Sequence, residues 1–151
     1  MTVERWSTDD PGVVELPSGC RIRGRRLTHE TPAGTLPTFA VQLAGRRPPE
    51  PAWERVWIPW KDFWLPANPA AATQILRDAH ARAATDRVEI GCSGGVGRTG
   101  TALAAICVLE EMSTDDAVEW VRAHYHPRAV EVPWQRRYLS YVQRSGGPAS
   151  S

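Results

Sequence analysis

Short runs of alternating or β-branched residues dominate the first sixty positions of the chain. Residues 12–16 and 20–27 flank Pro17-Ser18-Gly19, a composition typical of a tight turn between two strands. The stretch 44–52 is rich in Gly, Pro and Arg and predicts a loop. Three further runs have the length and composition of strands, at residues 38–43, 54–60 and 87–91.

Helical patterns dominate the rest of the chain. Asn68-Pro69 combines an N-cap residue with a proline at the first helical position, and it predicts a helix start. Residues 99–112 are apolar nearly all round and predict a buried central helix. On one face of the first helix, apolar side chains recur at Ile75, Leu76, Ala79 and Ala83.

Two more helices close the chain. Ser113 predicts the start of a helix that reaches about Tyr125, because Asp115 and Asp116 occupy its first turn. A short helix is predicted at residues 135–143. The order of strands and helices indicates an α/β fold, a three-layer sandwich with a mostly parallel central sheet flanked by helices. We expect a single domain over residues 1–144 and a disordered tail over 145–151.

Bulk composition limits the possible partners. The net charge is +1 over 151 residues, so no overall field attracts nucleic acid or an anionic membrane, and any affinity for phosphate must be local. No run approaches the roughly 18 apolar residues of a membrane span, and the N-terminus lacks a signal-peptide pattern. Three cysteines, an odd number, argue against a disulfide framework. We expect a cytoplasmic monomer.

The glycine-rich stretch 92–100 allows three interpretations. The nucleotide-binding pattern G-x-x-x-x-G-K-[ST] fails, because Cys92 stands at its first glycine and Arg98 at its lysine. The dinucleotide pattern G-x-G-x-x-G matches residues 95–100 letter for letter. That fold also needs an acidic residue about 20 positions on, at the end of a second strand. Here residues 118–120 are predicted to be helical, which weakens this interpretation.

The third interpretation is a cysteine followed by five residues and an arginine. Small residues let the backbone curl so that its N–H groups form an anion-binding nest at a helix N-terminus. Those amides stabilise a thiolate at Cys92, and Arg98 can grip two phosphate oxygens with its fork. The predicted phosphate-binding residues are Ser93, Gly94, Gly95, Val96, Gly97 and Arg98.

This loop resembles the signature His-Cys-x5-Arg-[Ser/Thr] of the protein tyrosine phosphatase superfamily, in particular its compact, dual-specificity-like members of bacterial type. Cys92, Gly97, Arg98 and Thr99 match, whereas Gly91 replaces the usual histidine. The resemblance implies that Cys92 is the nucleophile and Arg98 the phosphate clamp. It also implies that Thr99 assists departure of the thiolate in the second step.

The same family uses a carboxylic acid to protonate the leaving group. Residues 60–66 resemble its segment Trp-Pro-Asp-x-Gly-Val-Pro at Trp60, Asp62 and Pro66, while Lys61 and Trp64 depart from it. The resemblance therefore makes Asp62 the general acid. Two other acidic residues are weaker candidates, because Asp78 lies within a predicted helix and Asp86 in a polar connector.

A third match lies near the end of the chain. Residues 129–135 resemble the segment Val-Glu-Thr-x-x-Gln, with Val132 in place of the threonine. The resemblance implies that Gln135 orients the hydrolytic water; the alternative is a surface residue of a helix. The likeness covers about residues 56–142 and leaves the N-terminal part unmatched.

Taken together, these features predict a cysteine phosphatase that acts through a phosphocysteine, with no metal and no cofactor. A phosphoprotein is the expected substrate, because the loop lacks the lysines of many phosphoinositide-specific members. A non-catalytic phosphate-binding module and a sulfurtransferase or arsenate reductase remain as alternatives. Cys107 and Cys20 have no predicted role beyond packing. The four histidines, at 29, 80, 124 and 126, show no metal-ligand spacing.

Overall fold

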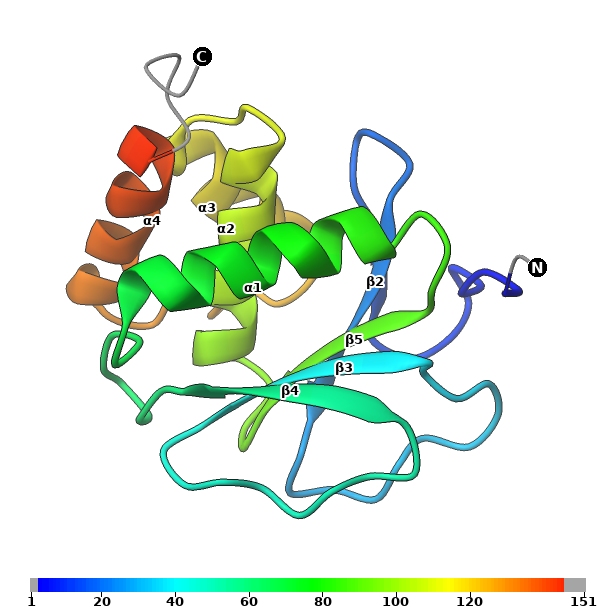
Figure 1. Ribbon diagram of the computed structural model, residues 1–151. Helices are drawn as coiled ribbons and strands as arrows, with labels where there is room; N and C mark the ends of the chain where they lie inside the picture. The colour runs from blue at the N-terminus through cyan, green and yellow to red at the C-terminus, as the bar shows by residue number, and fades with distance from the viewer. Residues whose placement is uncertain (1–2, 146–151) are drawn as a thin grey trace.

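A computed structural model of the chain describes residues 3–145 and shows a mixed α/β fold built on a five-stranded sheet (Figure 1). The sheet order is β1-β2-β5-β3-β4. β1 is antiparallel to β2, and every other neighbouring pair is parallel, which confirms the predicted mostly parallel sheet. The strands are β1 (Val13–Glu15), β2 (Arg21–Arg26), β3 (Phe39–Ala44), β4 (Glu54–Pro59) and β5 (Val88–Cys92).

The strand order brings several loops together at one edge of the sheet. β5 lies between β2 and β3, with Cys92 opposite Arg26 on one side and Leu43 on the other. Because β2, β5, β3 and β4 run in the same direction, their carboxyl ends share this edge. Ligands of open α/β sheets bind outside that edge. Cys92 is the last residue of β5.

Four helices follow the pattern expected from the sequence, with shifted ends. Asn68 caps the first helix by accepting from Ala71 N, and Ser113 caps the third by accepting from Asp116 N, both at 3.1 Å. The last helix starts at Pro133, two positions before the prediction, because proline suits the first turn. The helices are α1 (Pro69–Arg82), α2 (Gly97–Leu109), α3 (Thr114–His124) and α4 (Pro133–Ser145).

Two other predicted boundaries were wrong. α2 ends at Leu109 rather than at Met112, because Glu110 caps it and Glu111 takes a left-handed conformation with φ 75°. Ser145, predicted to lie in the tail, is the last residue of α4. The rest of the predicted tail, residues 146–151, lies outside the described residues.

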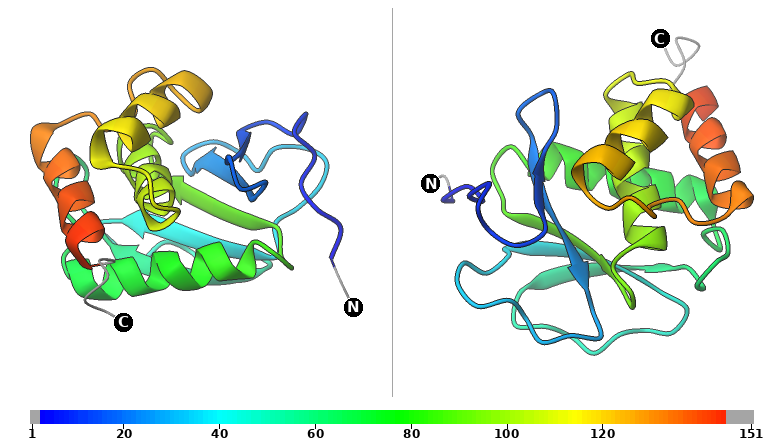
Figure 2. Two further views of the ribbon diagram at one scale, coloured as in Figure 1. Left: turned by 90° about the horizontal axis from the view of Figure 1, so that it is seen from above. Right: turned by 180° about the vertical axis from the view of Figure 1, so that it is seen from behind.

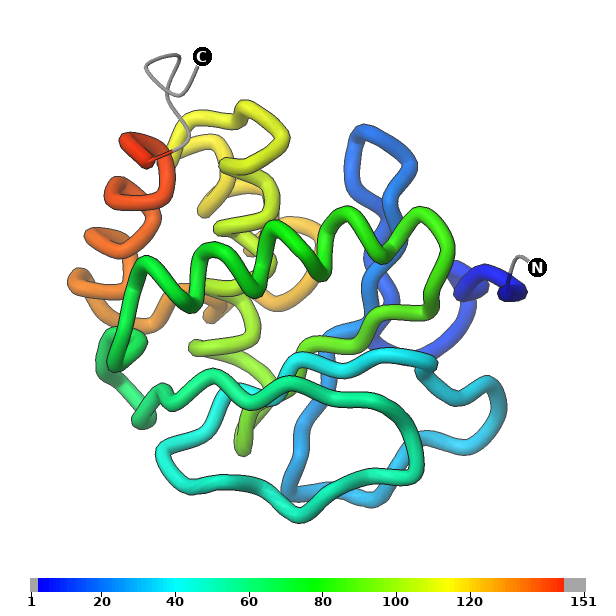
Figure 3. Tube along the Cα trace, viewed as in Figure 1, coloured from blue at the N-terminus to red at the C-terminus, as the bar shows by residue number. Residues whose placement is uncertain are grey.

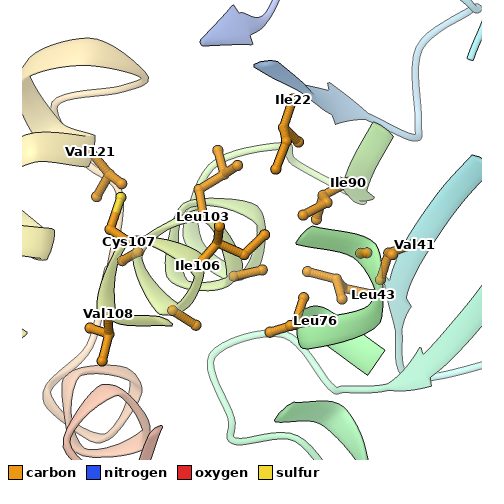
Figure 4. Packing of buried hydrophobic residues seen from close by; sticks show 14 of the residues in the cluster. Ile22, Val41, Leu43, Leu76, Ile90, Leu103, Ile106, Cys107, Val108 and Val121 are labelled. Carbon is orange, nitrogen blue, oxygen red and sulfur yellow. The ribbon is translucent and has the colours of Figure 1, made fainter. Parts of the chain in front are cut away.

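The hydrophobic core lies between the sheet and the helices. Side chains of β2, β3 and β5 point toward α1 and α2, as Figure 4 shows for Ile22, Val41 and Ile90. Leu76 of α1 and Leu103 of α2 meet them. Every residue of α2 from 97 to 108 is buried, because the sheet, α1, α3 and α4 surround this helix. The predicted central helix is therefore confirmed.

The opposite face of the sheet carries no helix among residues 3–145. All four helices gather on one side (Figure 2), so the expected three-layer arrangement has irregular chain as its third layer. Trp6 belongs to this layer: its Nε1 donates to Val88 O at 2.9 Å, and its ring covers the Arg23 guanidinium at 4.4 Å. Arg87 fastens the same layer by donating to the carbonyl oxygens of Glu4 and Leu36.

A buried ion pair ties β2 to β5 beneath this layer. Arg23 Nε donates to Glu89 Oε2 at 2.9 Å, and each side chain is 1% exposed. Removing one partner of such a pair leaves the other charge buried and uncompensated. Glu89→Leu is therefore expected to lower the free energy of unfolding by about 3–5 kcal/mol. Urea denaturation measures this loss.

A matched control uses the half-exposed pair between β1 and β2. Arg21 Nε lies 2.7 Å from Glu15 Oε1, and the Glu15 side chain is 44% exposed. Exposed pairs contribute less than about 1 kcal/mol, so Glu15→Leu should change stability little. Similar losses in the two variants would contradict a special role for the buried pair.

Candidate active site

Cys92 stands where β5 turns into α2. The four residues 93–96 connect it to Gly97, the first residue of α2. Its Sγ accepts hydrogen bonds from Gly95 N at 3.2 Å and from Thr99 Oγ1 at 3.0 Å. Gly95 has φ +70°, a conformation that glycine adopts without strain. The curl that the sequence predicted thus directs one backbone amide and one hydroxyl at the sulfur.

Neighbouring segments hold the carbonyl groups of this loop from outside. Leu27 N donates to Cys92 O at 2.8 Å, and Thr28 Oγ1 donates to Ser93 O at 2.8 Å. The Tyr125 hydroxyl donates to Gly95 O. Burial and the nearby Cys92 raise the pKa of Tyr125, so this hydroxyl keeps its proton and remains a donor. No local pattern indicates a role for Thr28 or Tyr125, because both residues come from segments distant from the loop.

The N-terminus of α2 is open to an anion. Val96 caps the helix without a side-chain hydrogen bond. The first N–H groups of a helix have no acceptor within it, and together with the helix dipole they attract negative charge. The predicted phosphate loop therefore has donors without protein acceptors at the turn where Cys92 lies.

Arg98 is pinned beside this helix terminus. Its side chain is 3% exposed, and Nη1 donates to Trp60 O at 3.0 Å and to Leu43 O at 3.3 Å. Nε is buried and has no hydrogen-bond partner. A buried donor without an acceptor is costly, and it marks a place where a ligand atom can bind.

The segment 60–66 folds into a compact loop next to Arg98. Trp60 pairs with Pro66 in an isolated bridge, and its Nε1 donates to Trp64 O at 2.7 Å. Asp62 is 55% exposed, and its Oδ1 lies 3.6 Å from Arg98 Nε. The same oxygen accepts from Phe63 N at 3.1 Å. The loop thus places an accessible carboxylate beside the buried guanidinium.

Gln135 lies in the interior rather than on the surface, so the surface alternative was wrong. Gln135 is 0% exposed, and it lies in the first turn of α4, a helix that packs against α2. Oε1 accepts from Glu131 N at 2.8 Å, whereas Nε2 is buried without a partner. Glu131 itself lies against the phosphate loop, since a Cβ at Gly97 would collide with its carboxylate.

Aromatic residues join the loop of Asp62 to the start of α4, and one of them, Trp134, had no role predicted from the sequence. Trp134 Nε1 donates to Phe63 O, and the rings of Trp64 and Trp134 lie 6.2 Å apart. Figure 3 shows the connection from β4 to α1 passing beside the start of α4. Phe63 and Val130 have φ values of 62° and 61°, so both loops hold a strained residue near the site.

The structure explains why residue 91 is a glycine rather than the histidine of the family signature. A Cβ at this position would lie 2.9 Å from Leu27 Cδ2 and 3.1 Å from Arg25 O. Leu27 therefore occupies the space that a histidine side chain at residue 91 would enter. The backbone of the loop is held by Leu27 and Thr28 instead.

Comparison with known proteins assigns the chain to a family. The family model for protein-tyrosine phosphatase matches residues 18–139. The chain belongs to the protein-tyrosine phosphatase family. The match includes β2 and β3, so the expectation that the N-terminal part is unmatched was wrong for residues 18–55. The dinucleotide interpretation of residues 95–100 is not supported. It needs a second strand that ends near residues 118–120, and those residues lie in α3.

Individual proteins that resemble this chain are also phosphatases by name or share its fold. Tyrosine-protein phosphatase 69D of Drosophila melanogaster is 31% identical over 64 residues, which are 41% of this chain and 4% of that protein. The chain thus spans a small fraction of this relative's length. The solved structure of Tk-PTP in the active form is 27% identical, with a TM-score of 0.60 over 70% of this chain and 77% of Tk-PTP. PTPMT1 shares the fold at 15% identity and a TM-score of 0.55, over 75% of this chain and 80% of PTPMT1.

No helix within residues 3–145 has both the length and the apolar character needed to cross a membrane.

Proposed function

We propose that this chain is a cysteine-dependent phosphatase that hydrolyses phosphate monoesters through a phosphocysteine intermediate. The observation that carries the proposal is the meeting of three groups at the start of α2. The Cys92 sulfur accepts two hydrogen bonds, the helix terminus lacks a side-chain cap, and Arg98 Nε is buried without a hydrogen-bond partner. A tetrahedral dianion in this loop offers acceptor oxygens to the start of α2 and to Arg98 Nε.

In the first step the Cys92 thiolate attacks phosphorus, the S–P bond forms and the P–O bond to the leaving group breaks. The amides of residues 93–98 and the Arg98 guanidinium stabilise the charge on the three equatorial oxygens. Asp62 gives its proton to the leaving oxygen. Its position 3.6 Å from Arg98 Nε brings it to the same phosphate that the guanidinium binds.

In the second step water attacks phosphorus, the S–P bond breaks and Asp62 takes a proton from the water. Thr99 Oγ1 donates to the Cys92 sulfur at 3.0 Å and stabilises it as it leaves. Gln135 supports the water through its amide. The buried, unpartnered Nε2 and the Oε1 held by Glu131 N fit a residue that a ligand completes.

The substrate we propose is a phosphoprotein, with phosphotyrosine or with dual specificity. The loop 93–97 carries no basic side chain. Beside the loop of Asp62, three aromatic side chains are exposed, and such a rim suits a peptide with an aromatic ring better than a polyhydroxylated headgroup. These residues are Phe63, Trp64 and Trp134, which are 49%, 63% and 38% exposed.

Turnover of a panel of substrates in the presence of a chelator tests the proposal. Phosphotyrosine peptide, phosphoserine peptide and phosphoinositide are compared at equal concentration. Release of phosphate from the phosphotyrosine peptide supports the proposal. Binding of phosphate without turnover indicates a non-catalytic module. Activity only with thiosulfate or arsenate plus a thiol reductant indicates the remaining alternative.

Arg98→Lys is expected to lower kcat/KM by about 10²–10³-fold, the usual effect of losing one transition-state donor. A lysine is a point charge and cannot both hold the carbonyl oxygens of Leu43 and Trp60 and present a fork to phosphate. Arg144→Lys, at the exposed end of α4, is the control and should leave the kinetics unchanged. A loss of only twofold in Arg98→Lys would show that Arg98 is not the clamp.

The contact between Trp134 and Phe63 O predicts a smaller effect. Trp134→Phe keeps an aromatic ring beside Trp64 but removes the indole donor that holds the loop of Asp62. One neutral hydrogen bond contributes about 0.5–1.5 kcal/mol, so kcat should fall by about 2–12-fold. Trp57→Phe is the matched control, because it also removes an indole bond to a carbonyl, that of Ala44, within the sheet. Equal losses of kcat in both variants would exclude a specific role for Trp134.

A further inference from the structure

A second cluster of reactive side chains lies away from the phosphate loop. The ligand atoms of Cys20, His80 and Glu110 all lie within 4.8 Å of one another. Cys20 precedes β2, His80 lies in the last turn of α1, and Glu110 follows the last residue of α2. These positions are far apart in the sequence, so no spacing pattern could reveal the cluster.

The cluster is partly buried and opens into a cavity. His80 Nε2 lies 2.7 Å from Glu110 Oε2, and the Ser18 hydroxyl donates to the same oxygen at 2.6 Å. The side chains of His80 and Glu110 are 31% and 10% exposed. The three residues and Ser18 line a cavity of about 640 Å³. The site therefore has room for an ion and for an additional water or ligand.

The donor set selects the metal. Thiolate sulfur, imidazole nitrogen and carboxylate oxygen are the three ligand types of protein-bound zinc. Magnesium and calcium prefer oxygen alone, so a site with sulfur and nitrogen disfavours them. A thiolate and a carboxylate together also balance the two positive charges of Zn²⁺. Three protein ligands leave one tetrahedral position open, as the cavity allows.

The geometry needs only small side-chain movements. With zinc–ligand bonds of about 2.0–2.3 Å, the ligand atoms of a tetrahedral site lie about 3.3–3.8 Å apart. The cluster is within 4.8 Å, so the wider separations need to shrink by about 1 Å. His80 and Glu110 must separate by a similar amount from their 2.7 Å contact.

We propose that Cys20, His80 and Glu110 form a zinc site, with water or the Ser18 hydroxyl as the fourth ligand. The ion replaces the thiol proton of Cys20 and the hydrogen bond between His80 and Glu110. The bound ion links the turn between β1 and β2 to the C-terminal ends of α1 and α2. Gly97 begins α2 at the phosphate loop and Glu110 follows its other end, so about 20 Å of helix separates the two sites. The zinc site is thus distinct from Cys92.

Zinc titration tests the site in a Cys92→Ser background, which removes the thiol of the phosphate loop as a competing ligand. Competition with a chromophoric chelator measures the number and affinity of the ions. We expect one equivalent in this background. Adding Cys20→Ser, His80→Gln or Glu110→Gln should weaken zinc affinity by at least about tenfold. His29→Gln, an exposed histidine outside the cluster, is the matched control and should retain the ion.

Two spectroscopic measurements complete the test. Co²⁺ in the same background should give a thiolate-to-cobalt charge-transfer band that is lost in Cys20→Ser and kept in Cys107→Ser. The melting temperature should rise with Zn²⁺ in the parent and not in His80→Gln, whose partly exposed position in the last turn of α1 lets the variant fold. A zinc affinity within twofold of the parent in either Cys20→Ser or His80→Gln would overturn the proposal, as would no binding to the parent. The three residues would then form only a hydrogen-bonded network.

Discussion

Cys92→Ser is expected to abolish turnover while binding of inorganic phosphate or tungstate stays largely intact. A serine hydroxyl is a far weaker nucleophile than a thiolate, so the phosphoenzyme cannot form. The anion-binding groups that we propose remain in this variant: the backbone amides of residues 93–98 at the start of α2 and the Arg98 guanidinium. We therefore expect loss of kcat below detection with a dissociation constant for tungstate within a few-fold of the parent.

The measurement combines steady-state kinetics with rapid acid quench of a labelled phosphopeptide. The parent should accumulate label on the protein, and Cys92→Ser should not. Cys107→Ser is the matched control because Cys107 is a second buried cysteine, in the α2 helix that follows the loop, and burial raises its pKa to about 12. Turnover near that of the parent in Cys92→Ser would rule out the covalent mechanism. Loss of tungstate binding together with turnover would mean that the sulfur shapes the loop.

Local patterns were enough to predict the elements around the phosphate loop. The caps at Asn68 and Ser113 form the hydrogen bonds expected of them, because capping depends on residues three positions apart. The all-apolar run that became α2 could only be a buried helix. β5 and the loop after it follow from a short apolar strand that ends at glycines and a cysteine. Each of these features is encoded within about fifteen residues.

Contacts between distant segments could not be predicted in the same way. Gln135 is a polar residue in the first turn of α4, and its burial depends on how that helix packs against the rest of the fold. The bond from Trp134 to Phe63 O joins residues 71 positions apart. The third layer of the fold is irregular chain fixed by Trp6 and Arg87, for which no periodic pattern exists. The departure at Gly91 is visible in the sequence, but its cause, the Leu27 side chain packed against it, is visible only in the structure.

The two other candidates for the general acid, Asp86 and Asp78, lie away from Arg98. Asp86 accepts from Thr38 Oγ1 at 2.9 Å and lies 3.3 Å from Arg82 Nε, and it precedes β5. Cys92 ends that strand, so about 17 Å of extended chain separates the two edges of the sheet. Asp78 accepts from Gln74 on the exposed side of α1. Among the three candidates from the sequence, only Asp62 lies beside Arg98.

Asp62→Ala should therefore lower kcat for phosphotyrosine by about 10²–10⁴-fold, the usual contribution of a general acid. The loss should be much smaller with an aryl phosphate whose phenol is already acidic, because that leaving group departs without a proton. Comparing both substrates measures this difference, and Asp86→Ala is the control that should leave both rates unchanged. The same substitution removes the contact between Asp62 and Arg98, which affects both substrates equally. A uniform loss would thus assign Asp62 to shaping its loop or orienting Arg98, whereas a loss that depends on the leaving group identifies proton transfer.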